Sequence, residues 1–325
     1  RKAPFVIPVT LGMLSRDGLA LSLQLADSTD SALQQTLVLT ETSARYTFVS
    51  IDSAPVPSLL RGFSAPVQLH YPYEVDQLLV LLAHDSDAFN RWEVAQRLYM
   101  SSILTALSSD ARNADLLSPA LINGLRSVLR DPTLDAAFKE LVLTLPSESY
   151  IAEQCATVDP QRIHSVRDTM RRQIAREMSQ DWVWAYETCA AKGTYQLDAK
   201  ACGDRALRGL ALGYLCMAEK SSNETTWSTK AYQDFLHADN MTDRMHALTA
   251  LVHNHLPHAA SALSHFYAMF KQDDLVIDKW FALQATTPDL DGDVLPKVRQ
   301  LLLHPDFHIR NPNRARSLLS TFCAN

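Results

Sequence analysis

The chain has 325 residues, of which 47% are hydrophobic and 20% are charged, and its formal net charge is -6 at pH 7. This composition is typical of a folded globular protein and excludes extended disorder, and the length favours two domains. Lysine and arginine are scattered along the chain and form no basic stripe that would neutralise nucleic-acid phosphates. We therefore expect no nucleic-acid partner.

The cysteines form an odd set without a C-x-x-C pair, so the sequence indicates neither a disulfide framework nor a zinc knuckle. We expect reduced, buried thiols and a cytoplasmic protein. The apolar runs are far shorter than the roughly 20 residues that span a bilayer, so we expect no contact with a membrane. The five cysteines are Cys155, Cys189, Cys202, Cys216 and Cys323.

The first part of the chain has the period of β-strands. Apolar residues alternate over 19–25 and again over 37–51, which is typical of half-buried strands. The Arg16-Asp17-Gly18 tripeptide is a turn signal beside the first of these runs. We predict a small antiparallel β-sandwich unit of roughly four or five strands over residues 1–70, which is marginal when isolated.

Residues 55–67 separate this β region from the rest of the chain. Three prolines in this segment fix φ and remove backbone donors, so neither a helix nor a central strand can run through it. Gly62 can take a φ that other residues avoid, while Leu59, Leu60 and Phe63 are too apolar for a loose linker. We predict a packed junction between two domains, in which Phe63 is buried.

From residue 71 to the end the apolar period is that of helices, with polar or proline-containing turns between them. Short turns favour helices that lie side by side, and no repeated signature is present. The fold class is therefore α+β and mainly α, with an irregular HEAT- or armadillo-like superhelix over residues 71–325. Helices are predicted at residues 87–106, 118–129, 134–145, 160–187, 204–218, 229–237, 242–255, 258–271, 275–284 and 294–303.

Five histidines occur within twenty residues and raise the question of a metal site. Positions 246 and 253 share a helix face, but about 10 Å along the axis separates them, too far for one metal. No His-Glu-x-x-His motif is present. We expect helix-surface histidines and no metal site at His246, His253, His255, His258 and His265.

Two other patterns on the predicted helices favour packing. Cys202 and Cys216 would lie roughly 21 Å apart on one helix, so they are interpreted as core thiols instead of a reactive pair. Gly209 and Gly213 have the small-x-x-x-small spacing at which helices approach closely.

Residues 309–316 contain three arginines beside two asparagines that can cap a helix. Positive charge at a helix N-terminus costs stability because the dipole is also positive there. Two interpretations stay open. Either Arg314 receives a carboxylate of a ligand, or an asparagine cap and internal salt bridges account for the segment.

Four stretches together resemble the C-terminal part of the bacterial aminopeptidase N family, the zinc metalloaminopeptidases of the gluzincin class. Their order and approximate spacing match over essentially the whole chain. The stretches are residues 5–8 (FVIP), 55–67 (PVPSLLRGFSAPV), 240–243 (NMTD), and 278–286 (DKWFALQAT) with 311–318 (NPNRARSL).

The resemblance implies a four-domain enzyme that removes N-terminal residues from peptides. Its third domain is a small β-sandwich, and its fourth is a helical superhelix that caps the active-site chamber. The family's zinc motif and its Gly-Ala-Met-Glu-Asn run are absent from this sequence. The implied partners are therefore the N-terminal catalytic domains and peptide substrates, and the zinc belongs to the full-length parent.

For this chain alone the resemblance implies no catalytic residue, no metal ligand and no activity. It also implies that the chain is short at both ends. Arg314 is the one site residue carried over from the family pattern, as a cavity-facing arginine that receives the far end of the peptide. The alternative is a free-standing helical-repeat interaction scaffold with a β module.

Overall fold

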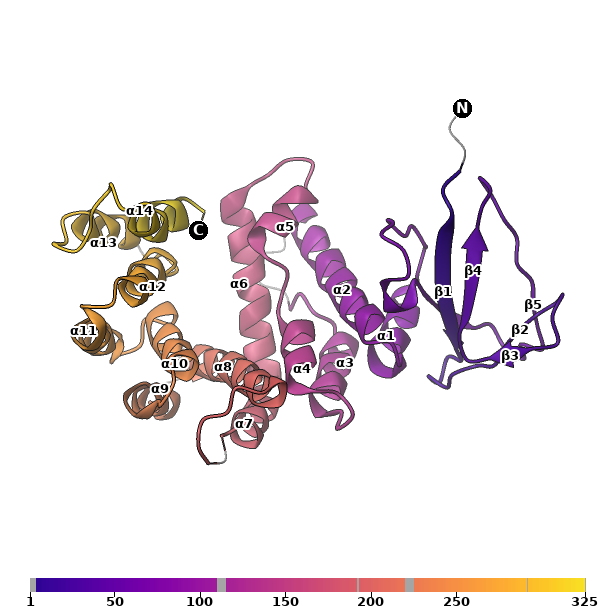
Figure 1. Cartoon of the computed structure of the whole chain (residues 1–325), viewed down its shortest axis with the longest axis horizontal. Coiled ribbons are helices and arrows are strands. Elements are labelled where there is room, and N and C mark those ends of the chain that lie inside the picture. Colours follow the sequence, from indigo (N-terminus) through magenta and orange to yellow (C-terminus); the bar gives the residue numbers. More distant parts are fainter. Residues whose placement is uncertain (1–3, 110–114, 192, 220–224, 291, 325) are drawn as a thin grey trace. The chain divides into compact units, whose positions relative to one another are not determined.

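The computed structural model describes residues 4–109, 115–191, 193–219, 225–290 and 292–324. The chain divides into two compact units, Arg1–Asp181 and Trp182–Asn325. Among the described residues, all strands and the helices up to α6 lie in the first unit, and α8 and later helices lie in the second (Figure 1). The predicted domain boundary between residues 70 and 71 stays a prediction.

The β part of the first unit consists of two small antiparallel sheets. In one, β1 pairs with β4 on one side and β6 on the other; in the second, β2 pairs with β3 and β5. Leu11, Leu14, Leu23 and Val56 are buried. A small antiparallel β unit ahead of the helices is therefore confirmed. The strands are β1 (Ile7–Leu14), β2 (Leu23–Leu25), β3 (Ser31–Ala32), β4 (Gln35–Leu39), β5 (Phe48–Val49) and β6 (Val56–Leu59).

The strands are shorter than the alternation predicts. Leu19 is 69% exposed because the turn at Gly18, whose φ is +83°, extends to it. The turn is closed by a hydrogen bond from the Ser15 amide to the Leu19 carbonyl, 2.8 Å long. Tyr46 also lies outside a strand, and its hydroxyl donates to the Val38 carbonyl at 3.0 Å. Apolar and polar residues continue to alternate through such turns, so the alternation predicts strands that are longer than the observed ones.

Side-chain caps fix where most helices of the first unit begin. Asp87, Ser118, Asp135 and Asp159 each accept a hydrogen bond from the backbone amide three residues later, which satisfies a donor that has no partner within the helix. The predicted starts at Asp87, Ser118 and Asp159 are thereby confirmed. The helices are α1 (Val75–His84), α2 (Ala88–Ser108), α3 (Pro119–Arg130), α4 (Ala136–Leu143), α5 (Glu148–Glu153) and α6 (Pro160–Glu177).

The helix predictions fail in detail at several places, one of which is α5, since the sequence predicts no helix over 148–153. The sequence predicts no separate helix at 75–84, yet α1 forms there behind a capping box between Glu74 and Gln77. The single helix predicted over 160–187 is interrupted at Met178, whose φ and ψ of −112° and 20° are not helical. The segment after it is α7 (Ser179–Thr188). The apolar period continues across Met178, so the pattern does not reveal the break.

The junction after the β unit is packed, but not by the residue predicted. Phe63 is 54% exposed, and its ring meets that of Phe89 on α2, with ring centroids 5.2 Å apart. The prediction of a buried Phe63 is wrong because Leu60 and Gly62 both take positive φ, and the chain turns outward. Polar groups hold this junction instead.

A buried ion pair joins the segment after β6 to the start of α2. Arg61 donates to Asp85 at 2.5 Å, and its Nε donates to the Ser58 hydroxyl at 2.8 Å. The Asn90 amide donates to the same hydroxyl at 2.8 Å. A Cβ at Gly12 would lie 2.7 Å from the Arg61 guanidinium, so only glycine leaves room for this side chain.

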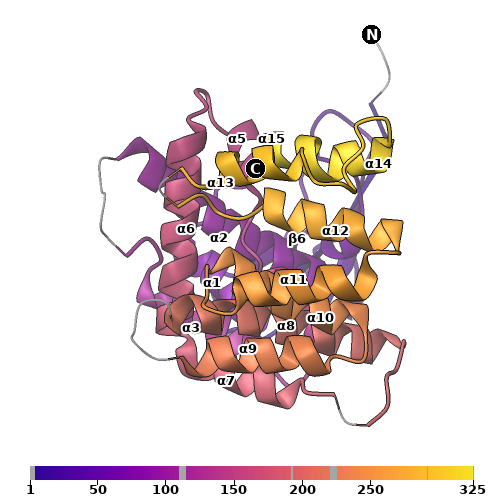
Figure 2. The ribbon, with the colours of Figure 1, turned by 90° about the vertical axis from the view of Figure 1, so that its left-hand side faces the viewer.

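Helices of the second unit pack in chain order. Contacts join α8 to α9 and α10, and then α10 to α11, α11 to α12, and α12 to α13 (Figure 2). The helical array predicted for this region is confirmed. The elements are α8 (Ala199–Glu219), α9 (Thr226–His237), α10 (Met241–His253), α11 (Ala259–Phe270), α12 (Asp274–Ala285), α13 (Val294–Leu301), α14 (Pro312–Ala315), the π-helical segment η2 (Arg316–Ser320) and α15 (Thr321–Cys323).

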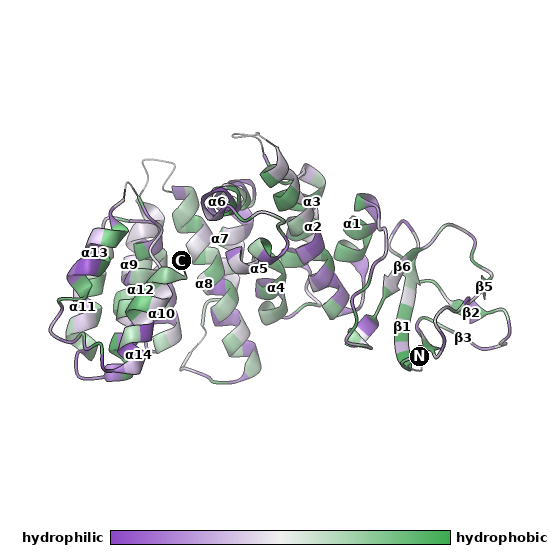
Figure 3. Cartoon of the chain, turned by 90° about the horizontal axis from the view of Figure 1, so that it is seen from above, coloured by the Kyte–Doolittle hydropathy of each residue, from purple (hydrophilic) through white to green (hydrophobic). Residues whose placement is uncertain are grey.

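Hydrophobic and hydrophilic residues mix along the helices, as expected for elements with one buried face (Figure 3). In the second unit the apolar faces enclose Phe235, Phe266 and Phe281, and Trp182 stacks on Tyr214 with centroids 4.5 Å apart. No helix in the described ranges combines the length and the apolar character that a membrane span requires.

Candidate functional site

Arg314 lies on α14, behind the cap that the sequence predicts. The Asn311 side chain accepts hydrogen bonds from the backbone amides of Asn313 and Arg314, at 3.1 and 3.3 Å. The Arg314 side chain turns inward, and the residue is only 2% exposed. Its Nε pairs with Asp278 of α12 at 2.5 Å, and its Nη2 pairs with Asp274 at 3.3 Å.

The rest of the Arg314 guanidinium is also occupied by groups of the chain. Nη1 donates to the Asp306 carbonyl, and the guanidinium carbon lies 5.1 Å from the centre of the Phe281 ring. All three nitrogens therefore have partners in the protein. The cap and internal salt bridges of the second interpretation are present, and contact between Arg314 and a peptide stays a prediction.

The five histidines of residues 246–265 have separate surroundings. His253 lies 3.1 Å from the Thr286 hydroxyl, and His255 lies 2.8 Å from the Pro288 carbonyl. His258 stacks on Tyr232, whereas the His265 ring meets Phe235 edge-on. Within the part of the chain that the structure describes, no group of three or more His, Cys, Asp or Glu residues could hold a metal ion.

Gly209 provides the close approach that its spacing predicts, and Gly213 does not. A methyl group at position 209 would overlap the His246 ring of α10, whereas nothing lies within 4 Å of a Cβ at position 213. The absence of a side chain at Gly209 therefore allows α8 to lie against α10. Gly213 has no such neighbour.

The five cysteines differ in burial, whereas the sequence predicts that all of them are buried. Cys189 and Cys216 are buried, but Cys202 and Cys323 are exposed, so the prediction that all five thiols are buried is wrong. Burial raises the pKa of the Cys216 thiol well above its ordinary value. Cys216 therefore stays neutral and behaves as a core residue, as predicted.

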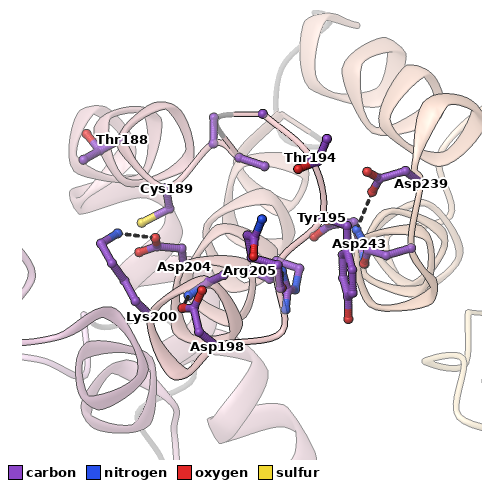
Figure 4. Close-up of a pocket in the computed structure, with 16 residues that line it drawn as sticks. Thr188, Cys189, Thr194, Tyr195, Asp198, Lys200, Asp204, Arg205, Asp239 and Asp243 are labelled. Atoms are coloured by element: carbon purple, nitrogen blue, oxygen red, sulfur yellow. Dashed lines mark hydrogen bonds and ion pairs between the residues drawn. The ribbon is translucent and has the colours of Figure 1, made fainter.

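One cavity of the second unit brings together residues that the sequence does not single out as a site. It has a volume of about 290 Å³ and is lined by the end of α7, the first turns of α8 and the turn between α9 and α10 (Figure 4). Asn240 and Asp243, from one of the stretches that resemble the peptidase family, form part of its wall.

Helix starts place several charges around this cavity. Asp198 accepts from the Ala201 amide at 2.8 Å and so caps α8, and Lys200 pairs with Asp204 at 2.6 Å. Across the cavity, the Asn240 side chain accepts from the Asp243 amide and begins α10. These bonds fix the directions of the wall side chains.

Arg205, on α8, is the buried cation of this cavity and is 7% exposed. Its Nη1 donates to the Gln196 carbonyl at 2.9 Å, its Nη2 lies 3.2 Å from the Cys202 sulfur, and its guanidinium covers the Tyr195 ring at 4.8 Å. Its Nε is buried without a hydrogen-bond partner. No carboxylate among the described residues forms an ion pair with Arg205.

Comparison with known proteins places the chain among peptidase homologues. Residues 75–325 match a family model described as "Domain of unknown function (DUF3458_C) ARM repeats", and residues 1–72 match one described as "Domain of unknown function (DUF3458) Ig-like fold". Aminopeptidase N of Haemophilus influenzae is 34% identical over 97% of this chain, and that of Escherichia coli is 32% identical over 100% of it.

A solved structure agrees with these matches. Aminopeptidase A of Legionella pneumophila, crystallised with aspartic acid, covers 98% of this chain with a TM-score of 0.80 and 26% identity. The chain spans only 35% and 36% of the two curated relatives, and 36% of the solved chain. The resemblance to bacterial aminopeptidase N is thus confirmed, and the chain belongs to the DUF3458_C family of ARM-repeat domains.

Proposed function

We propose that this chain is a non-catalytic part of a zinc aminopeptidase that removes N-terminal residues from peptides. The observation that carries the proposal is the near-complete match of the chain to about a third of proteins named Aminopeptidase N, at 32 and 34% identity. In this proposal the helical region closes the chamber in which the peptide is cleaved. It restricts access to peptides and presents polar side chains to them.

Zinc chemistry does not fit the residues of this chain. In enzymes of this class a bound zinc polarises the scissile carbonyl and activates water. A zinc site takes three protein ligands in close tetrahedral geometry. The sequence has no His-Glu-x-x-His motif, and the histidines of residues 246–265 that are described above each contact different groups. We therefore assign no catalytic step to any residue here.

The partner that we propose for the β unit is the catalytic part of the same enzyme. Phe5 is 82% exposed, and Val6, Leu33 and Val38 are also exposed in this small unit. Large apolar side chains that a small β unit leaves exposed are removed from water when another domain packs on that unit. The cytoplasmic location predicted from the cysteines stays a prediction.

Activity measurements test the proposed function. The 325-residue chain, a full-length protein that contains it and the full-length protein without residues 71–325 are compared on a chromogenic aminoacyl amide, on a tetrapeptide and on a larger polypeptide. We expect no turnover by the chain alone. We expect the shortened enzyme to lose the discrimination between peptides and larger polypeptides.

Metal analysis completes this test. One zinc per chain that survives dialysis of the isolated 325-residue protein would contradict a non-catalytic role. A start codon and ribosome-binding site directly before Arg1 in the gene would favour the free-standing scaffold instead. An upstream reading frame that encodes His-Glu-x-x-His supports the peptidase.

The predicted contact between Arg314 and the far end of a peptide has its own test. In the full-length enzyme, Arg314→Ala is compared on a peptide with a free C-terminal carboxylate and on a single-residue amide that is too short to reach it. A selective loss on the peptide, roughly 1.5–3 kcal/mol of binding, supports the contact. Equal losses identify Arg314 as a structural residue, in accordance with its pairs to Asp278 and Asp274.

A further inference from the structure

Cys202 is an exposed thiol that the proposed function does not use. It lies near the start of α8, and its backbone amide donates to the Asp198 carbonyl at 3.0 Å. Cys323 is also exposed, but it is the last residue of α15. The helix dipole favours a negative charge at a helix N-terminus and disfavours one at a C-terminus. The two exposed thiols therefore lie in opposite electrostatic surroundings.

A buried cation contacts the Cys202 sulfur. The Nη2 of Arg205 lies 3.2 Å from this sulfur, and Arg205 is only 7% exposed. The other groups that contact the guanidinium are the Gln196 carbonyl, at 2.9 Å, and the ring of Tyr195. Its Nε has no hydrogen-bond partner, and no carboxylate in the described residues pairs with it. The charge of Arg205 is therefore not matched by any anion of the fold.

This contact favours a negative charge on the Cys202 sulfur. Burial of a charge is costly unless the charge is paired, and Cys202 is the only hydrogen-bond partner of Arg205 that can ionise. The neighbouring charges have partners of their own, since Lys200 pairs with Asp204 at 2.6 Å and the Asp198 carboxylate accepts from a backbone amide. The thiolate is the nucleophilic form of cysteine, and exposure gives reagents access to it.

We propose that Cys202 is a site of reversible modification, at which Arg205 stabilises the thiolate and a small disulfide such as glutathione disulfide forms a mixed disulfide. The thiol first loses its proton to water, and the sulfur then attacks one sulfur of the reagent. The S–S bond of the reagent breaks as the new S–S bond forms, and the other half leaves as a thiolate. This site goes beyond the proposed peptidase function and does not depend on it.

The test compares Cys202 with Cys323 in the intact 325-residue chain. Iodoacetamide, which is uncharged, is added at pH 7, and alkylation of each cysteine is followed over time by peptide mass spectrometry. We expect Cys202 to react at least about threefold faster than Cys323, because a larger thiolate fraction outweighs the lower nucleophilicity of a stabilised thiolate. In concentrated urea, where the contact with Arg205 is lost, the difference should disappear.

Variants assign the effect to Arg205. Arg205→Gln removes the positive charge and should slow alkylation of Cys202 at least about threefold, whereas Arg205→Lys keeps the charge and should retain most of the difference. The control is Arg172→Gln, an exposed arginine of α6 that pairs with Asp168 and should leave both rates unchanged. With glutathione disulfide in place of iodoacetamide, the mixed disulfide should form first at Cys202, and dithiothreitol should remove it.

Each outcome decides the proposal. Equal alkylation rates for Cys202 and Cys323 in the folded chain would overturn it, as would a Cys202 rate that Arg205→Gln does not change. Reaction of glutathione disulfide that is no faster at Cys202 than at Cys323 would overturn the mixed disulfide. If Arg205→Gln does not fold, the comparison between the folded chain and the chain in urea carries the test. Because no peptidase activity is measured, failure here leaves the peptidase proposal standing.

Discussion

Two buried arginines of the second unit have opposite surroundings. Arg314, on α14, has Asp278 and Asp274 as ion-pair partners and a backbone carbonyl at its remaining nitrogen. Arg205, on α8, is buried to a similar degree but has one carbonyl, one sulfur and an aromatic ring. The charge of Arg314 is satisfied within the fold, whereas that of Arg205 is not.

This difference sets a charge that carboxylates of the fold pair apart from a charge that they leave unpaired in the described residues. Removal of one partner of a buried ion pair strongly destabilises the fold because the other charge is left unpaired in a medium of low polarity. A buried arginine without a carboxylate instead carries an electrostatic cost that a ligand carboxylate can offset. Residues 311–318 are one of the stretches that resemble the peptidase family. They therefore contain the arginine whose charge has carboxylate partners within the protein.

The largest effect is expected at the Arg314 pair. Arg314→Met leaves Asp278 buried without its partner, so it should lower the free energy of unfolding by about 3–5 kcal/mol. Asp274→Asn is the control, since the Asp274 side chain is exposed, and it should cost at most about 1 kcal/mol. Urea unfolding monitored by tryptophan fluorescence measures both. A loss below about 1 kcal/mol for Arg314→Met would contradict the comparison.

Arg61 extends the comparison to the first unit. It pairs with Asp85, whose side chain is fully buried, so Asp85→Ala should also cost about 3–5 kcal/mol and loosen the junction after the β unit. Phe63→Ala should cost less than about 1 kcal/mol because Phe63 is exposed. The rate of limited proteolysis near residues 55–70 measures how firmly the junction is held. Faster cleavage of Phe63→Ala than of Asp85→Ala would refute the polar junction.

Packing near Arg205 can be tested without a change of charge. Gly209→Ala should lower the free energy of unfolding by about 1–3 kcal/mol because the new methyl group overlaps His246. Gly213→Ala, four residues later on α8, meets no atom and should raise stability by up to about 1 kcal/mol. Thermal unfolding of the two variants provides the comparison. The same sign for both would show that α8 and α10 are not in close contact at Gly209.

The smallest effect is expected at an intermediate case, the pair of buried Arg91 with partly exposed Asp131. Burial would raise the pKa of Asp131, but hydrogen bonds from Thr133 and Arg91 outweigh it and hold the pKa below its ordinary value. The resulting stability is present above the pKa of the unfolded chain and is lost as the pH falls through the folded pKa.

Asp131→Asn should therefore cost at most about 1 kcal/mol at neutral pH and nothing once the pH lies below the folded pKa of Asp131. Urea unfolding at a series of pH values measures this difference. A cost that stays constant down to acid pH would show that the ionised Asp131 carboxylate does not stabilise the fold.

Local chemistry made much of the fold predictable. Capping side chains such as Asp87, Ser118 and Asp159 mark helix starts because they bond to amides only three residues away. Met178 gives no such signal, because neither proline nor glycine lies at the break between α6 and α7. The prediction for Phe63 is wrong because an apolar residue type reveals neither the positive φ of Phe63 itself nor that of Leu60 and Gly62.

The cavity could not be predicted because its parts are distant in sequence. The wall residues come from 188–205 and from 239–243, and only the packing of α8, α9 and α10 unites them. The sequence analysis assigns no role to Asp239, and it uses Asp243 only as part of the stretch 240–243 that resembles the peptidase family. Arg205 lies in a predicted helix, where a charge is expected to face solvent, and its burial follows from the loop at Tyr195 and Gln196 that covers it.

The comparison between the two arginines is tested most directly by urea unfolding of Arg314→Gln and Arg205→Gln. We predict that Arg314→Gln lowers the free energy of unfolding by about 3–5 kcal/mol, whereas Arg205→Gln lowers it by at most about 1 kcal/mol. Equal losses for the two variants would contradict this account.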